Sequence, residues 1–230
     1  MGLQVLDQPK NLPDYSEIEK LRKTLYRNSE KIQIEDHGAG SLGNVRAERS
    51  IFEIAKRSLS TQAKSVKLAR LAQYIEAKNI LELGTSLGIN ALYLAKHCPN
   101  AQIITVEGSK SIYDLAKHHF DQAKIKNISP ICGTFDAQLP NILKGKDFDL
   151  IYLDGDHRYE STIRYVNAIF PFLTSGSVLV LDDIHWSGEM SKAWAEIVDS
   201  HRFTYTLDLY HQGWLFMLDG TINQEFIVRW

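Results

Sequence analysis

The sequence is short of several features that would place it in a specialised class of protein. Its 230 residues contain two cysteines, Cys98 and Cys132, which are too few for a disulfide framework and lack the spacing of metal ligands. No apolar run approaches the roughly 18 residues of a membrane-spanning helix, and no charged-then-apolar leader precedes the first helical pattern. We therefore expect a cytoplasmic protein with no membrane partner.

An excess of charge of one sign is also lacking. The formal net charge is −2, and 23% of the residues are charged. Without a surplus of basic residues, there is no electrostatic reason to expect nucleic acid as a partner. The hydrophobic content of 44% is that of an ordinary globular protein. The length suits one α/β domain with a small appendage.

The chain is organised around the stretch from Asn79 to His97. Ile80 to Leu83 form a short apolar run, which predicts a buried parallel strand, and apolar residues return at helical spacing after Gly88. Gly84 can adopt a positive φ and let a ligand approach the backbone, and Gly88 lets the helix begin close to the strand. The loop between them can hold a small polar molecule against backbone N–H groups. A plain strand-to-helix turn is the alternative.

This loop lacks the third glycine of a dinucleotide-binding motif and the Gly-Lys-Ser/Thr ending of a P-loop. Instead, Glu82 stands two residues before Gly84, which gives the pattern E-x-G-x-x-x-G at a strand end. The pattern resembles the first motif of class I S-adenosylmethionine-dependent methyltransferases. The resemblance implies a set of cofactor-binding residues: Glu82, Gly84, Thr85, Ser86 and Gly88.

Two further predicted strands end with residues suited to a nucleoside. The run Ile103 to Val106 leads to Glu107 and Gly108, and an ionised carboxylate there can accept both hydroxyl protons of a ribose. A cap for the following helix is the alternative role of Glu107. The strand from Ile128 to Cys132 is followed by three candidates for contacts with the base: Thr134, Phe135 and Asp136.

Acidic residues follow the next two predicted strands. Asp154 comes after Phe148 to Leu153, and the pair Asp182-Asp183 comes after Ser177 to Leu181. Because parallel strands deliver their carboxyl ends to one edge of the sheet, we expect these three carboxylates to lie together. They repel one another unless a cation sits among them, and oxygen ligands suit Mg²⁺, Mn²⁺ or Ca²⁺. Helix caps or hydrogen-bond anchors are the alternative roles for Asp154 and Asp182.

His157, three residues after Asp154, together with the acid pair after the next strand, resembles the cation-dependent O-methyltransferases of the catechol, caffeoyl-coenzyme A and sugar type. The resemblance covers the chain from about Asn79 to Leu218. It implies that Asp154, Asp182 and Asp183 hold a divalent cation, that Asp154 also contacts the cofactor, and that His157 is the general base. The chain departs from the family at Asp183, where Asn is usual, and at His157, where catechol enzymes carry Lys. A solvated loop histidine is the alternative for His157.

The remaining patterns complete the predicted fold. Helical patterns occupy most of residues 1–78, interrupted by a polar loop at 34–43 that is either a linker or a lid. Two runs at 203–209 and 213–218 predict an antiparallel terminal pair. We predict an α/β fold with a doubly wound, seven-stranded, mostly parallel sheet. An N-terminal helical extension spans 1–78, on the lid or substrate side, and a methyltransferase domain spans 79–230.

The hypothesis from sequence is methyl transfer from S-adenosylmethionine to an oxygen of a small molecule, assisted by Mg²⁺ or another divalent cation. His185 and Trp186 are candidates for the acceptor pocket, and the pair His118-His119 is expected at the surface. The alternatives are a metal-independent methyltransferase with another acceptor (small molecule, protein or RNA) and a non-catalytic S-adenosylmethionine-binding protein. The sequence leaves open the acceptor and whether the chain forms a homodimer.

Overall fold

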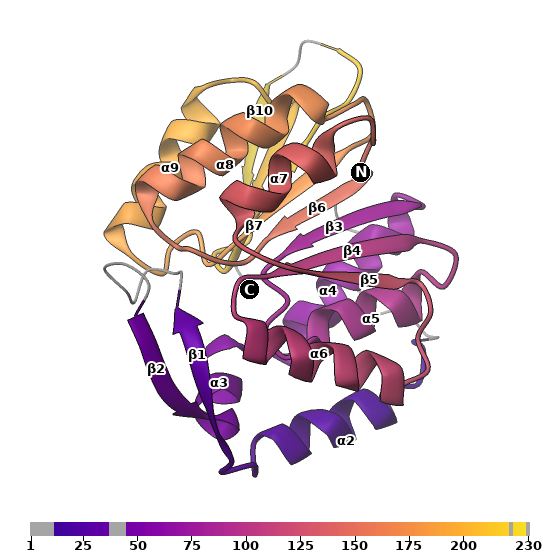
Figure 1. Ribbon diagram of the computed structural model, residues 1–230. Coiled ribbons are helices and arrows are strands. Elements are labelled where there is room, and N and C mark those ends of the chain that lie inside the picture. The colour runs from indigo at the N-terminus through magenta and orange to yellow at the C-terminus, as the bar shows by residue number, and fades with distance from the viewer. Residues whose placement is uncertain (1–11, 37–44, 221–222, 229–230) are drawn as a thin grey trace.

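The computed structural model describes residues 12–36, 45–220 and 223–228. At its centre lies an eight-stranded sheet with the strand order β10-β8-β9-β7-β6-β3-β4-β5, in which β9 is antiparallel to its neighbours and the other strands are parallel (Figure 1). The strands are β3 (Asn79–Leu83), β4 (Gln102–Glu107), β5 (Ile128–Cys132), β6 (Leu150–Leu153), β7 (Val178–Asp182), β8 (Tyr205–Asp208), β9 (Gln212–Phe216) and β10 (Gln224–Ile227). The predicted seven-stranded topology is confirmed, and β10 adds an edge strand to it.

Helices cover both faces of this sheet (Figure 1). One face carries α4 (Gln62–Tyr74), α5 (Ile89–His97) and α6 (Lys110–Gln122). The other carries α7 (Phe135–Leu143), α8 (Tyr159–Ile169) with the short helix η1 (Phe170–Phe172), and α9 (Gly188–Asp199). Neighbouring residues of one strand enter different cores, as Ile80 and Leu81 do, and both are fully buried. Burial on both faces explains why the strands read as continuous apolar runs.

The N-terminal part contains strands as well as helices. α2 (Ser16–Leu25) and α3 (Ile51–Ser58) flank an antiparallel pair formed by β1 (Lys31–Asp36) and β2 (Val45–Ser50). The prediction of a loop at 34–43 is therefore wrong for residues 34–36, and residues 37–44 lie outside the described residues. Ile32 and Ile34 alternate with polar residues, which is strand periodicity. β1 lies beside α6, where Ser111 Oγ donates to the carbonyl oxygen of Gln33 at 2.5 Å.

A buried polar network fastens α2 to the rest of the molecule. Glu19 Oε1 accepts hydrogen bonds from Arg22 Nε at 2.9 Å and from the Tyr93 hydroxyl at 2.6 Å. Arg22 also donates to the carbonyl oxygen of Ser60 at 2.5 Å, just before α4 begins. The apolar residues of α2 and α3 belong to the same core cluster as those of α4 and α5. Over the described part of the chain, the helices are too short or too polar to cross a membrane.

Candidate active site

The carboxyl ends of the central strands open into a cleft of about 1400 Å³. The chain winds outward in one direction through β3, β4 and β5 and in the other through β6 and β7, so the direction reverses between β3 and β6. Such a reversal is where open α/β sheets bind ligands. The cleft exceeds the roughly 300–1,000 Å³ of a typical single-ligand pocket. It is large enough for two molecules side by side.

The glycine loop forms the floor of this cleft. Gly84 has φ +109°, and a Cβ placed on it would lie 1.9 Å from the carbonyl oxygen of Asp154. Its backbone N–H donates to the carbonyl oxygen of Val106 at 3.0 Å. Only glycine allows this combination of positive φ and close approach to β6. Gly84 and Ser86 line the cleft, whereas the N–H groups of both residues already donate within the protein, to Val106 and Glu107.

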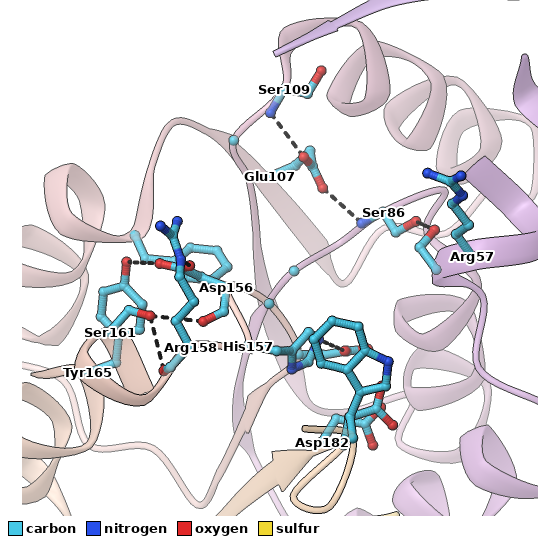
Figure 2. Close-up of a pocket in the computed structure, with 18 of the residues that line it drawn as sticks. Arg57, Ser86, Glu107, Ser109, Asp156, His157, Arg158, Ser161, Tyr165 and Asp182 are labelled. Carbon is cyan, nitrogen blue, oxygen red and sulfur yellow. Dashed lines mark hydrogen bonds and ion pairs between the residues drawn. The ribbon is translucent and has the colours of Figure 1, made fainter. Parts of the chain in front are cut away.

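Glu107 stands at the end of β4, with its carboxylate held between two backbone donors (Figure 2). Oε2 accepts from the N–H of Ser86 and Oε1 from the N–H of Ser109, both at 2.9 Å. Burial raises the pKa of Glu107 to about 7, against hydrogen bonds from Ser109, Ser86 and Gly108 that lower it. Each carboxylate oxygen has a second lone pair, so the group can still accept two hydroxyls of a ligand.

Three residues of the predicted cofactor set lie behind the loop rather than along the cleft. Glu82 is fully buried and accepts from the Thr105 hydroxyl at 2.5 Å, and burial raises its pKa to about 8. The Thr85 hydroxyl lies 2.5 Å from the same Thr105 hydroxyl. A Cβ on Gly88 would lie 2.7 Å from the Phe120 ring. These residues shape the loop from within, and their direct contact with a cofactor stays a prediction.

His119 also supports this loop, which corrects its expected place at the surface. It is buried, and its Nδ1 lies 2.9 Å from the carbonyl oxygen of Leu87. His118 beside it is exposed. Successive residues of a helix lie about 100° apart around its axis, so His119 falls on the buried face of α6 and His118 outside it. His119 therefore fastens α6 to the glycine loop.

The residues predicted to meet a nucleoside base all line the cleft. Thr134 caps α7, and the Phe135 ring packs edge-on against Tyr165 with centroids 5.5 Å apart. Asp136 forms a bidentate pair with Arg164, at 2.9 and 3.1 Å. The Tyr165 hydroxyl lies near both Asp136 and Asp156 (Figure 2). An aromatic face rimmed by polar groups suits a flat heterocycle.

The three predicted acidic residues come together on the other side of the cleft, and a lysine lies against two of them. Lys64, in the first turn of α4, places its Nζ 2.7 Å from Asp182 Oδ2 and 3.2 Å from Asp183 Oδ1. The side chain of Asp182 is 3% exposed and that of Lys64 20%. Burial disfavours the ammonium, but the carboxylates of Asp182, Asp183 and Asp154 outweigh it and raise the pKa of Lys64. Lys64 is therefore a fixed positive charge at neutral pH.

His157 lies beside this cluster. Its Nε2 is 3.5 Å from Asp154 Oδ1, and its ring centroid is 6.0 Å from that of Trp186. Burial lowers the pKa of His157, but Asp154 and the other carboxylates outweigh burial and raise it. Trp186 lines the cleft with 63% of its surface exposed. His185, expected in the same pocket, pairs instead with Asp208 at 2.8 Å and is not among the residues lining the cleft.

Comparison with known proteins decides the family. A family model described as O-methyltransferase matches residues 46–222. The chain belongs to this O-methyltransferase family.

Individual relatives agree with the assignment. The catechol O-methyltransferase of Mycobacterium tuberculosis is 28% identical over 119 residues, which cover 51% of this chain and 53% of that protein. This chain spans about half the length of the first curated relatives it matches. Among solved structures, the O-methyltransferase TomG of Streptomyces achromogenes has a TM-score of 0.64, with 17% identity over 90% of this chain and 92% of that one. A methyltransferase of Podospora anserina has a TM-score of 0.63, with 17% identity over 92% of this chain and 100% of that one.

The side chains of this O-methyltransferase do not fit the predicted divalent cation. The ammonium of Lys64 already hydrogen-bonds one oxygen of each member of the Asp182-Asp183 pair. Among the residues that the structure describes, no three His, Cys, Asp or Glu side chains are grouped so as to hold a metal ion. The carboxylates do require a cation nearby, as the sequence indicated, and Lys64 supplies one.

Lys64 is the site residue that sequence reasoning missed. It lies 118 residues before Asp182 on a helix whose pattern signals only an amphipathic element. A weak local signal exists, because Thr61 caps α4 by accepting from the N–H of Lys64 and so fixes where the first turn starts. The cap does not indicate which distant residues the side chain of Lys64 contacts.

Proposed function

We propose that this protein transfers the methyl group of S-adenosylmethionine to an oxygen of a small molecule. The observation that carries the proposal is the continuity of the cleft: a glycine loop with a strand-end Glu107 at one side, and the Asp154, His157 and Lys64 cluster at the other. A donor site and a polar acceptor site thus share one space. The solved relatives from Bacillus cereus and Streptomyces achromogenes are described in complex with S-adenosylhomocysteine and S-adenosylmethionine, respectively, which supports this donor.

In this proposal Glu107 accepts the two ribose hydroxyls, because its carboxylate is already oriented by Ser86 and Ser109. The base lies against Phe135, within reach of Thr134 and Asp136. Gly84 and Ser86 hold the methionine part against the backbone. Asp154 follows β6 next to Gly84, so it stands between the donor and the acceptor. Gly108, which follows Glu107, lets the ribose lie close to the chain.

Methyl transfer breaks the bond between the sulfonium sulfur and the methyl carbon and forms a bond from that carbon to the acceptor oxygen. The acceptor hydroxyl must lose its proton, and His157 is the proposed base because it lines the cleft beside Asp154. Positioning the two molecules side by side lowers the entropic cost of their reaction. Assistance by a divalent cation stays a prediction from the resemblance, and the pairing of Lys64 with the Asp182-Asp183 pair weighs against it.

The acceptor is proposed to be a small molecule because the cleft is concave and mixed in polarity, with the exposed Trp186 as an aromatic wall. The N-terminal part contributes to the lining from its strands and from α3, so the proposed substrate role of this part is shared between them: Ile34, Glu35, Arg49, Ile54, Arg57 and Ser58. A cytoplasmic location and a homodimer stay predictions.

The experiment that tests the function combines binding with turnover. We expect calorimetry to show binding of S-adenosylhomocysteine, and methyl-labelled donor to label an oxygen of at least one phenol, hydroxy acid or other alcohol in a metabolite library. His157→Ala should lower that turnover by about 10²–10⁴-fold with donor affinity nearly unchanged. Binding without labelling of any acceptor would favour the non-catalytic alternative, and absence of donor binding would contradict the proposal outright.

A further inference from the structure

We propose that the ammonium of Lys64 takes the place of a divalent cation in this site. Lys64 offsets one of the three negative charges of Asp154, Asp182 and Asp183, and it donates a hydrogen bond to the acceptor oxygen as that oxygen becomes an anion. The inference rests on the proposed methyl transfer. It names the group that stabilises the negative charge developing on the acceptor oxygen. It also implies that methyl transfer here does not depend on an added metal.

Lys64 has a fixed position in the cleft. Lys64, Asp154, His157, Asp182 and Asp183 line the same part of the cleft, and the ammonium is held by two carboxylates from the end of β7. α4 begins at a capped turn, with Thr61 accepting from the N–H of Lys64, so the lysine leaves a fixed point of the backbone. Because both its backbone and its ammonium are held, the Lys64 side chain is preorganised, unlike a mobile lysine on the surface.

The ammonium of Lys64 has more N–H donors than its carboxylate partners use. An ammonium has three N–H groups, and two are directed to Asp182 Oδ2 and Asp183 Oδ1. In the described part of the chain, no side chain or carbonyl accepts the third. A group that lines a cleft with one donor to spare can bind one oxygen of a ligand. The oxygen of a hydroxyl that is losing its proton is the ligand such a donor favours most.

The charges around Lys64 favour an ammonium at this point. The carboxylates of Asp182, Asp183 and Asp154 lie around Lys64, and Asp182 Oδ1 is buried with no hydrogen-bond partner among the described residues. The ammonium offsets one of these three negative charges without any ion from solution. A divalent cation at the same carboxylates would face repulsion from Lys64 at close range. A cation that took Asp182 Oδ2 and Asp183 Oδ1 as ligands would have to displace the ammonium from those two oxygens.

The test is a titration with Mn²⁺ in the presence of S-adenosylhomocysteine, in which electron paramagnetic resonance measures the free and bound Mn²⁺. We expect no saturable binding to the wild-type protein up to about 1 mM Mn²⁺, a concentration at which weak oxygen-ligand sites fill. Lys64→Met removes the ammonium at nearly the same length, and we expect it to raise Mn²⁺ affinity about tenfold or more, because the repulsion is gone. The gain should vanish in the double variant Lys64→Met/Asp182→Asn.

Lys56→Met is the matched control, because Lys56 is exposed on α3 and is not among the residues lining the cleft. It should leave Mn²⁺ binding unchanged. Saturable micromolar binding to the wild-type protein that Asp182→Asn removes would overturn the proposal, and this comparison needs no lysine variant to fold. Unchanged Mn²⁺ affinity in a folded Lys64→Met protein would overturn it as well. Calorimetry of S-adenosylhomocysteine on the same samples separates the role of Lys64 from the proposed function. A wild-type protein that does not bind S-adenosylhomocysteine would contradict the methyltransferase function itself.

Discussion

Glu107 links binding of the donor to pH. Its pKa is raised to about 7 by burial, so the carboxyl is largely protonated at pH 6 and ionised at pH 8. A ribose donates two hydroxyl protons, which the ionised form accepts best. We expect the affinity for S-adenosylhomocysteine to fall as pH drops below 7, by up to about tenfold per pH unit. Calorimetry between pH 5.5 and 8.5 measures this.

Glu107→Gln is the control for that prediction. The amide keeps the size of the side chain but cannot ionise, so binding should be weaker and independent of pH over the same range. Glu82, whose pKa is raised to about 8, is unchanged in this variant and would still titrate. Asp182, whose pKa is also raised to about 7 by burial, would titrate as well. A pH dependence that survives in Glu107→Gln would therefore assign the effect to another group, such as Glu82 or Asp182, and contradict the role given to Glu107.

Gly84 is a position where an added side chain is expected to destabilise the fold strongly. Gly84→Ala combines a positive φ with a Cβ that would lie 1.9 Å from the carbonyl oxygen of Asp154. We expect a loss of about 3 kcal/mol or more in the free energy of unfolding, since strain and overpacking add. Gly176→Ala shares the positive φ, at +95°, but meets nothing within 4 Å, and it should cost about 1–2 kcal/mol. Equal losses in urea unfolding would show that the contact with Asp154 is unimportant.

Residues at the ends of strands could be predicted from the sequence, because a parallel sheet gathers them at one edge whatever the details of packing. Glu107, Asp154 and Asp182 reach the cleft on that basis alone. Site residues on helices could not be predicted in this way. A helical pattern indicates the buried face of the helix, but it does not indicate which distant residues a long side chain contacts. Lys64 and His119 are examples, and both depend on contacts with distant segments.

At the scale of elements, strands with clear apolar runs were predictable and short strands of mixed polarity were not. β1 and β2 carry many polar residues, and part of the segment was interpreted as a loop. All four residues of β10 are exposed, so it has no buried face whose periodicity could reveal it. Its pairing with β8 is made by the backbone, which any sequence can supply.

The docking of α2 gives a prediction at this scale. Arg22 is buried and joins Glu19 on its own helix to the carbonyl oxygen of Ser60 before α4. Arg22→Ala removes the Arg22 donor from that carbonyl and one of the two donors to Glu19, whose other donor is the Tyr93 hydroxyl. We expect the free energy of unfolding to fall by about 2–4 kcal/mol.

Lys23→Ala is the matched control, because Lys23 is the next residue of α2 and is exposed. It should change stability by about 0.5 kcal/mol or less. Urea unfolding of both variants measures the difference. Equal effects would mean that α2 contributes little to the stability of the molecule.

For the molecule as a whole, buried His97 sets a pH window of stability. Its Nε2 hydrogen-bonds the Tyr15 hydroxyl, and burial lowers its pKa from 6.5 to about 4. The folded protein therefore holds His97 neutral, whereas the unfolded chain protonates it below pH 6.5. The stabilisation is fully present above pH 6.5 and is lost as pH falls toward 4, by a few kcal/mol at most, at about 1.4 kcal/mol per pKa unit.

Unfolding in urea at several pH values between 4.5 and 7.5 tests this. His97→Gln should flatten the slope of stability against pH in that window, whereas His118→Gln, on the exposed face of α6, should leave the slope as it is. A variant at His97 that keeps the full slope would assign the acid sensitivity to other groups.

The pairing of Lys64 with Asp182 has a consequence for how the protein is made. The two residues are 118 positions apart, so at about 5–20 residues per second a ribosome needs roughly 6–24 s to pass from one to the other. Throughout that interval the nascent chain carries α4 without the carboxylates that hold its lysine, and the ammonium stays in water. Lys64 gains its two carboxylate partners only after β7 has emerged from the exit tunnel and paired with β6.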